Sequence, residues 1–369
     1  MPARLGRWVS AMRAELDAID APHAALGFAL GCLGCALREA MTARATEWLA
    51  RARRHRKTQS AMGIEMPNVR EMWNGPRRRV AMCAVAATIL GLGYMALAGA
   101  PMRYLLVNTA ALAIGLGLAA LLSRRSWASG ALVTLALAIG LLATASFGIS
   151  VNGATRWVRM AGLALQPALI VLPLIATGFA RSRGWLGLAG VAVAALALAI
   201  QPDRGGAGAL AAGMAALAML RPTRSVVIAF ALSAFAFGAT MLRVDVQPAM
   251  PYVDRIVYTA FSSGLVPGAA VLAGLTLLLV PVAPTLARRT AGDEPVLVFG
   301  AVWTALIAAA VLGNYPTPLV GYGGSAILGY VIALLSFPPT GVSTLEVQAA
   351  GQSENSDDKV LPRQAVGLA

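Results

Sequence analysis

The sequence predicts an all-α, polytopic membrane protein with about ten transmembrane helices, preceded by a small helical cytoplasmic region. Hydrophobic residues make up 58% of the 369 positions and charged residues only 12%, whereas soluble domains lie nearer one half and one quarter. So much apolar surface indicates that lipid is the solvent. From Val80 onward, long apolar segments alternate with short breaks that hold most of the charges, which is the pattern of a chain that crosses a bilayer repeatedly.

Residues 1–79 form a basic region with a composition of its own. It holds 14 Lys and Arg against 7 acids, a surplus of 7 within the net charge of +14. No cleavable signal peptide is visible, because charges occur throughout the first 20 residues. Residues 5–20 and 24–54 are expected to be helices, but the apolar run 24–37 is too short to span a bilayer. Because the region leads into membrane helices, its charge favours anionic lipid headgroups over nucleic acid.

The three cysteines do not predict a metal or redox site. Cys32 and Cys35 have the spacing of a redox motif, but no βαβ pattern surrounds them and no second ligand pair is present for zinc. Together with Cys83 they are interpreted as small buried hydrophobic residues.

Ten apolar segments follow the basic region, and several of them are only 15 or 16 residues long. Such short segments are expected to tilt little in the bilayer or to extend into their polar flanks. The segments cover residues 80–100, 104–122, 130–148, 166–180, 185–200, 205–220, 225–242, 264–287, 295–313 and 318–337.

The charges between the segments support this number and give an orientation. With the N-terminus in the cytoplasm, the loops after segments 2, 4, 6 and 8 are cytoplasmic, and each carries a pair of arginines, as the positive-inside rule predicts. These pairs are Arg124 and Arg125, Arg181 and Arg183, Arg221 and Arg224, and Arg288 and Arg289. Residues 80–337 are therefore expected to be a ten-helix domain, and residues 338–369 a polar, disordered cytoplasmic tail.

The opposite, external loops also carry arginines, against the orientation signal. One loop holds Arg156, Trp157 and Arg159, a second holds Asp203 and Arg204, and the longest, about 243–263, holds Arg243, Asp245, Asp254 and Arg255. Binding of an anion such as phosphate explains arginines in these places, because the guanidinium fork matches phosphate oxygens. The alternative is that they contact lipid headgroups or pair with the three aspartates.

Only three carboxylates lie in the predicted external loops, namely Asp203, Asp245 and Asp254. A general base on this face must come from these three, because the external loops hold no His and no Cys. The two histidines of the chain, His23 and His55, fall in the predicted cytoplasmic region. A Ser-His-Asp hydrolase is thereby excluded.

Four segments resemble the SEDS family (shape, elongation, division and sporulation), the FtsW, RodA and SpoVE type of ten-helix protein. Residues 152–167 are similar to the family's G-x-x-R-W segment that ends in Q-P, with Arg156, Trp157, Gln166 and Pro167 matching. Residues 201–205 resemble its [QE]-P-D-x-G motif, and Asp254 stands where the family has an aspartate before helix 8. Residues 316–325 resemble its P-L-P-F-x-S-Y-G-G-S motif and carry Pro318, Tyr322, Gly323, Gly324 and Ser325.

The resemblance implies a peptidoglycan glycosyltransferase of the bacterial inner membrane that serves cell division or cell shape. Such a protein polymerises lipid II at the outer membrane face together with a class B penicillin-binding protein. Asp254 would be the general base, in a pocket lined with guanidinium groups. Arg156, Arg159 and Arg204 would stabilise the undecaprenyl diphosphate leaving group, with Trp157 and Asp203 beside them. A divalent cation on the substrate diphosphate is compatible with this chemistry, and no protein metal site is expected.

The chain also departs from the family pattern. Ala168, Leu169 and Leu172 replace a Ser-Glu-x-x-Lys set, and Ser262 and Ser263 replace two glutamates. Each change removes polar groups from the expected cavity. Two alternatives therefore stand beside the enzyme: an inactive SEDS-like scaffold or regulator of a cell-wall synthase, and a transporter of lipid-linked sugar. The twin glycines Gly323 and Gly324 are expected to serve helix packing rather than catalysis.

Overall fold

The computed structural model describes residues 75–122, 130–160, 162–244, 247–288 and 292–337. The predicted helices at 5–20 and 24–54, and the predicted tail 338–369, lie outside the described residues. So do Asp245 and the arginine pair at 124–125.

The described part of the chain is built mainly from helices, in agreement with the predicted fold class. Lipid offers no hydrogen-bond partners to the backbone, so a spanning segment satisfies its amide groups internally as a helix. The helices are α4 (Pro76–Leu97), α5 (Met102–Leu122), α6 (Ala131–Phe147), α7 (Pro167–Ser182), α8 (Trp185–Ile200), α9 (Arg204–Leu220), α10 (Arg224–Met241), α11 (Ile256–Ser263), α12 (Leu265–Leu279), α13 (Ala283–Arg288), α14 (Glu294–Leu312) and α15 (Gly324–Ile332), with 3-10 turns η2 (Val280–Val282) and η3 (Ala333–Ser336).

Each of the ten predicted segments corresponds to a helix. Within the described residues, five helices are long and apolar enough to cross a membrane: α4, α5, α10, α12 continued through η2 into α13, and α14. The shorter apolar helices of the described residues, of 10 to 17 residues, are α6, α7, α8, α9 and α15 continued by η3. Of these, α7, α8 and α9 match the segments of 15 or 16 residues that the sequence marks as short. The chain is a polytopic, helical membrane protein.

Three boundaries differ from the prediction. Helix α4 begins at Pro76 rather than at residue 80, because proline at the first helical position is pre-organised for a helix and Arg77 is buried within it. Helix α15 begins at Gly324 rather than at residue 318, because Leu319 has a φ of +60° and the chain bends before the helix. The predicted external loop 243–263 contains helix α11, whose buried residues Ile256 and Ala260 are one turn apart.

A small antiparallel sheet, which the sequence analysis did not predict, joins α6 to α7. Its strands are β1 (Ile149–Val151), β2 (Ala154–Met160) and β3 (Leu163–Leu165), in the order β1-β2-β3. Asn152 and Gly153 connect the first two strands, and both have positive φ, which is typical of the two-residue hairpin turn. Val151 pairs with Ala154, and Met160 pairs with Leu163. The sheet fixes where β2 presents its side chains.

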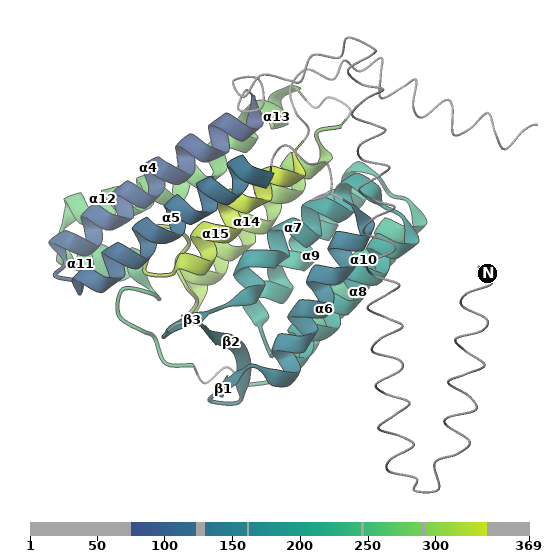
Figure 1. The fold of residues 1–369 in the computed structure, drawn as a ribbon, viewed down its shortest axis with the longest axis horizontal. Coiled ribbons are helices and arrows are strands. Elements are labelled where there is room, and N and C mark those ends of the chain that lie inside the picture. The colour runs from purple at the N-terminus through teal and green to yellow at the C-terminus, as the bar shows by residue number, and fades with distance from the viewer. Residues whose placement is uncertain (1–74, 123–129, 161, 245–246, 289–291, 338–369) are drawn as a thin grey trace, which may run out of the picture. The chain divides into compact units, whose positions relative to one another are not determined.

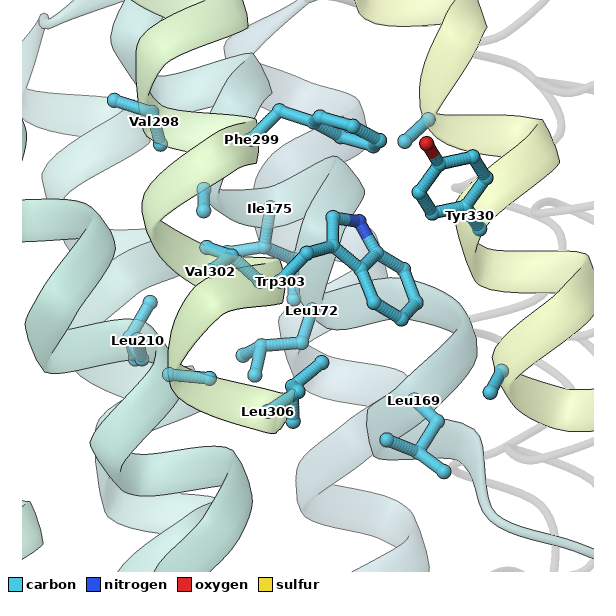
Figure 2. Packing of buried hydrophobic residues seen from close by; sticks show 14 of the residues in the cluster. Leu169, Leu172, Ile175, Leu210, Val298, Phe299, Val302, Trp303, Leu306 and Tyr330 are labelled. Carbon is cyan, nitrogen blue, oxygen red and sulfur yellow. The ribbon is translucent and has the colours of Figure 1, made fainter. Parts of the chain in front are cut away.

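The buried core lies where α7, α14 and α15 pack together. In Figure 1, α4, α5 and α12 lie to one side of these helices, and α6, α8 and α10 lie to the other. Figure 2 shows aromatic rings of α14 and α15 facing aliphatic side chains of α7. Trp303 contacts Tyr330 at a ring-centroid distance of 5.0 Å, and Phe299 lies 5.0 Å from the same ring. The Trp303 and Tyr330 rings meet edge-on, and all three rings belong to one cluster of buried hydrophobic residues.

Every second connection between successive helices lies at the same end of the helices, which we call the sheet end. Hydrogen bonds join these connections, from Tyr252 to Ala98, from Arg204 to Arg243 and from Gln247 to Val151. The sheet end consists of β1–β3 and the described residues 98–101, 201–203, 242–244, 247–255 and 313–323. At the opposite end, Glu294 forms ion pairs with Arg221 and Arg183. Successive connections therefore alternate between two ends, as helices that cross a bilayer require.

Candidate functional site

The sequence motifs at Gln166, Asp203 and Ser325 meet at the sheet end. Gln166 is the N-cap of α7 and is buried, and its backbone N–H donates to Ser325 Oγ at 2.9 Å. Its side-chain amide donates to Asp203 Oδ2 at 3.3 Å. Pro167 occupies the first position of α7, where its missing N–H costs nothing. Three segments that are distant in the sequence are thereby joined through one glutamine.

Asp203 has a structural function in this arrangement. It is 1% exposed and is the N-cap of α9, where its Oδ1 accepts a hydrogen bond from Gly206 N at 3.0 Å. A side chain on Gly206 would place its Cβ 2.9 Å from the Asp203 carboxylate, so glycine is required there. The cap satisfies an otherwise unpaired helix N–H. It also fixes Arg204, the first residue of α9.

Arg156 connects the sheet to the start of α9. It lies on β2, is 5% exposed, and donates to the backbone carbonyls of Gln201 and Pro202. Two motif segments are thus held together by one guanidinium group. Its neighbour Trp157 is half-buried on the same strand, and Arg159 is exposed.

Asp254 lies in a separate part of the sheet end, in the loop before α11. It is 8% exposed and forms a β-bridge with Pro316, and its Oδ2 accepts a hydrogen bond from Met250 N at 2.9 Å. Among the described residues, Asp254 forms no ion pair with an arginine. Burial raises the pKa of this carboxyl above its ordinary value of 3.8, and the Met250 hydrogen bond opposes the shift only in part. Asp254 is therefore a buried carboxylate with raised basicity.

The turn before α15 packs directly on the Asp254 loop. Tyr322 N donates to Tyr252 O at 2.6 Å, and Thr317 N donates to Val253 O at 2.9 Å. The Tyr322 ring stacks on Tyr104 of α5 at a centroid distance of 3.8 Å. Pro318 is buried in this turn, and Gly323 and Gly324 begin α15. A Cβ on Gly324 would lie 3.0 Å from the Ala111 Cβ, which agrees with the close-packing role expected for this glycine, whereas a Cβ on Gly323 would meet no atom within 4 Å.

A cationic pocket of about 140 Å³ opens between the sheet, the start of α9 and the loop that follows α10. This is roughly ten times the 10–15 Å³ that one water needs on the same measure. Three arginines from three connections line it: Arg156, Arg204 and Arg243. Arg204 Nη2 donates to Arg243 O at 2.9 Å, whereas Arg204 Nε is buried and has no partner among the described residues. The Arg243 side chain is exposed, so the pocket offers guanidinium donors to an anion.

An apolar groove of about 650 Å³ lies beside the cationic pocket, and Arg204 lines both. Apart from Arg204, its walls are small or apolar residues of α9, α10 and α14, together with Gly313 and Tyr315 at the sheet end. Small side chains such as Ala212 and Ala308 leave this space open. An anion-binding pocket beside an apolar groove is an arrangement suited to bind a lipid with an anionic headgroup.

The structure brings together only some of the residues that the sequence selected. Arg156 and Arg204 share the cationic pocket, but Arg159 and Asp254 line neither the pocket nor the groove. From the sequence, Arg243 is one of the external arginines attributed to anion binding or headgroup contact, but it is not assigned to the substrate site. Its position just after a helix, in a predicted external loop, marks Arg243 as a candidate for anion binding, but nothing in the sequence shows that it shares a pocket with Arg156.

The described residues hold no group of three or more His, Cys, Asp or Glu side chains that fits a metal ion.

Comparison with solved structures finds the same fold in a bacterial membrane protein. The chain is similar to crystal structures of the rod shape determining protein RodA of Thermus thermophilus, in a point-mutant and an unmutated form. The TM-scores are 0.51 and 0.50 at 22% identity, covering 69% of this chain and 94% and 93% of the RodA chains. A further match belongs to a peptidoglycan synthase complex that coordinates polymerization and crosslinking, with a TM-score of 0.49, 22% identity and coverage of 69% and 94%. No protein-family model matches the chain, and no curated protein matches it.

The chain therefore has a SEDS-like fold, which agrees with the motif resemblance found in the sequence. At 22% identity the likeness to RodA establishes the fold and leaves the activity to be argued from the site.

Proposed function

We propose that this protein is a SEDS-type, peptidoglycan glycosyltransferase-like enzyme that uses a lipid-linked sugar diphosphate such as lipid II. One observation carries the proposal: the cationic pocket of Arg156, Arg204 and Arg243 adjoins the apolar groove, and the two share Arg204. An isoprenoid chain fits the chemistry of the groove, and a diphosphate fits the chemistry of the pocket. The SEDS-like fold and the four motif segments are consistent with this substrate.

In the proposed reaction, the Asp254 carboxylate takes the proton from a hydroxyl of the acceptor sugar. The hydroxyl oxygen then attacks the anomeric carbon of the donor, and the bond from that carbon to the diphosphate oxygen breaks. The bonding electrons leave with the isoprenyl diphosphate, whose charge the arginines of the pocket stabilise. Burial supports the role of Asp254, because a base with a raised pKa binds the proton more strongly. Glycan strands grow by repetition of this step.

The proposal includes an orientation. The sheet end faces the outside of the cell membrane, and the end with Arg183, Arg221 and Glu294 faces the cytoplasm, which agrees with the positive-inside rule. Residues 1–79 and 338–369 then lie in the cytoplasm. A class B penicillin-binding protein is the proposed partner, because glycan polymerisation and crosslinking serve the same cell wall.

The test of the binding site compares variants of the purified protein on labelled lipid II, with and without the partner. Arg243→Ala removes one pocket guanidinium, and Arg224→Ala is its control, because Arg224 is also an exposed arginine but lines neither cavity. We expect Arg243→Ala to lower kcat/KM by about 10-fold to 100-fold, the cost of losing a hydrogen bond to a charged group. Arg224→Ala is expected to leave kcat/KM unchanged.

The test of the groove uses donors of different chain length. Ala212→Phe fills the groove, and the control Ala110→Phe adds the same ring to the exposed surface of α5. We expect Ala212→Phe to lower use of a long-chain donor about tenfold or more, with little effect on a short-chain donor that does not reach the groove. Equal effects on both donors would contradict the assignment of the groove to the lipid chain.

The same assay separates the alternative functions. Polymer that disappears with Asp254→Asn supports the enzyme. Absence of polymer from the wild-type protein under every condition, with or without the partner, favours the scaffold. Transbilayer movement of the lipid that survives Asp254→Asn favours the transporter.

A further inference from the structure

Helix α5 buries a single polar side chain, and it does so next to the turn that supports Asp254. The buried residues of α5 are Asn108, Ala111, Gly115 and Ala119, which form one stripe along the helix. This stripe faces α15, where a Cβ on Gly115 would lie 3.3 Å from the Val331 Cβ. Asn108 is 0% exposed. An amide in this position, on a helix that otherwise faces lipid, is costly unless its polar atoms are paired.

Both polar atoms of the Asn108 side chain are paired, and both partners belong to one turn. Nδ2 donates to Gly321 O at 2.8 Å, and Oδ1 accepts from Gly323 N at 3.1 Å. The amide therefore bridges the residues on either side of Tyr322. The Tyr322 ring is also held, because it stacks on Tyr104, one turn before Asn108 on the same helix. Helix α5 thus fixes Tyr322 at its backbone and at its ring.

The fixed turn is in direct contact with the Asp254 loop. Tyr322 N donates to Tyr252 O at 2.6 Å. The Tyr252 hydroxyl donates to Ala98 O at 2.9 Å, and its ring meets the Tyr104 ring edge-on at 6.2 Å. Tyr252 has a φ of +63°, a conformation that a non-glycine residue keeps only when its surroundings impose it. Asp254 follows two residues later and is bridged to Pro316, at the start of the same turn segment.

We propose that Asn108 is a positioning residue for Asp254, acting through the backbone of residues 321–323 and then through Tyr252. This inference rests on the proposed function for its catalytic consequence, although the coupling between the two loops does not. Asn108 does not touch Asp254 or either cavity. Asn108 acts on Asp254 indirectly, by fixing the backbone conformation of the loop that carries the carboxylate.

The chemistry of the bridge requires an amide. One atom must donate to a carbonyl oxygen while the other accepts from an N–H group, and the asparagine side chain supplies both at the correct separation. Leucine has a similar size and neither group. An ionised aspartate has two acceptors and repels the Gly321 carbonyl, whereas a protonated aspartate has one donor and one acceptor again.

The experiment compares Asn108→Leu and Asn108→Asp with the control Thr88→Val in the full-length protein. Thr88 is also a buried polar residue on a membrane helix, but its hydroxyl has no hydrogen-bond partner among the described residues. Amide hydrogen exchange is measured by mass spectrometry on peptides that cover residues 250–256 and 319–325. Polymerisation of labelled lipid II is measured across a range of pH.

In Asn108→Leu we expect about tenfold faster exchange in both peptides, because the turn and then the Asp254 loop lose their support. We expect kcat to fall about 10-fold to 100-fold, the effect of a misplaced catalytic group. KM for the lipid donor should stay unchanged, because other connections form the donor site. Thr88→Val should change none of these quantities.

Asn108→Asp provides a signature that general destabilisation does not give. Its kcat relative to the wild-type protein should rise as the pH falls, because the protonated carboxyl restores the bridge. A ratio that stays constant with pH, or exchange at 250–256 that Asn108→Leu leaves unchanged, would overturn the proposal. If the wild-type protein makes no polymer, the proposed function has failed. The hydrogen-exchange measurement then tests by itself whether Asn108 supports the Asp254 loop through the turn 321–323.

Discussion

The cap of α9 gives the most quantitative prediction, because Asp203 joins two motif segments through atoms that can be removed separately. In Asp203→Ala the helix loses the hydrogen bond from Gly206 N, which costs about 1 kcal/mol. The Gln166 amide also loses its acceptor in a buried place, which costs about 1–3 kcal/mol. The expected destabilisation is about 2–4 kcal/mol. For a domain of this size it lowers Tm by roughly 5–12 °C.

The assay is thermal unfolding of the detergent-solubilised protein, followed by intrinsic tryptophan fluorescence. Asp203→Asn keeps an acceptor for Gly206 N and should lose less, about 1 kcal/mol. Thr223→Ala is the matched control, because Thr223 is the N-cap of α10 but its side chain makes no capping hydrogen bond. In a double-mutant cycle, Asp203→Ala and Gln166→Ala should lower stability by less than the sum of their separate effects.

The reasoning would be refuted if Asp203→Ala unfolded at the same temperature as Thr223→Ala, or if the cycle showed full additivity. Either result would mean that the cap and its link to Gln166 contribute nothing to stability. A secondary consequence concerns the site, because Arg204 directly follows Asp203. Asp203→Ala should therefore also weaken binding of inorganic diphosphate to the cationic pocket, measured by calorimetry.

Two further predictions concern packing and pH. Gly329→Ala should destabilise the protein by about 1–3 kcal/mol, because the added Cβ would lie 1.9 Å from the Leu169 carbonyl oxygen on α7. The measurement is Tm, and Gly117→Ala is the control, since Gly117 faces open space. An unchanged Tm for Gly329→Ala would contradict this packing. Burial raises the pKa of Asp254 above 3.8, so the folded protein binds this proton more tightly than the unfolded chain does. Its contribution to stability is then greatest at low pH and is lost as the pH rises from 3.8 through the folded pKa, so Tm should fall over this window in the wild-type protein but not in Asp254→Asn. For the same reason, the polymerisation rate should begin to fall on acidification at a pH above 3.8. A rate that falls only at or below pH 3.8 would argue against Asp254 as the base.

The sequence was informative about the membrane helices because the bilayer leaves the backbone few choices. Long apolar segments must become helices, and all ten predicted segments did. The sequence was less informative about the connections, where water allows other structures. It did not predict the sheet, although Asn152 and Gly153 form a recognised hairpin signal between β1 and β2. It also placed α11 within a loop, because eight residues are too few for a clear helical period.

For the candidate site, the sequence selected chemical groups but not their neighbours. It pointed to Arg156 and Arg204 because arginine on the external side needs a reason, and these two do share a pocket. It expected Asp254 to face guanidinium groups, whereas in the described structure its carboxylate accepts from the Met250 backbone. Asn108 drew no attention at all, because one amide within an apolar segment carries no periodic signal.

By itself, then, the sequence determined the solvent of this protein, the positions of ten apolar segments that form helices and the residue types available for chemistry at each end. These follow from composition and local pattern, which act within one segment at a time. Only the tertiary structure decided which of those residues meet. Gln166 reaches Asp203 and Ser325 across sequence separations of 37 and 159. Contacts over such separations depend on how the helices pack, and side-chain shape along several helices sets that packing together.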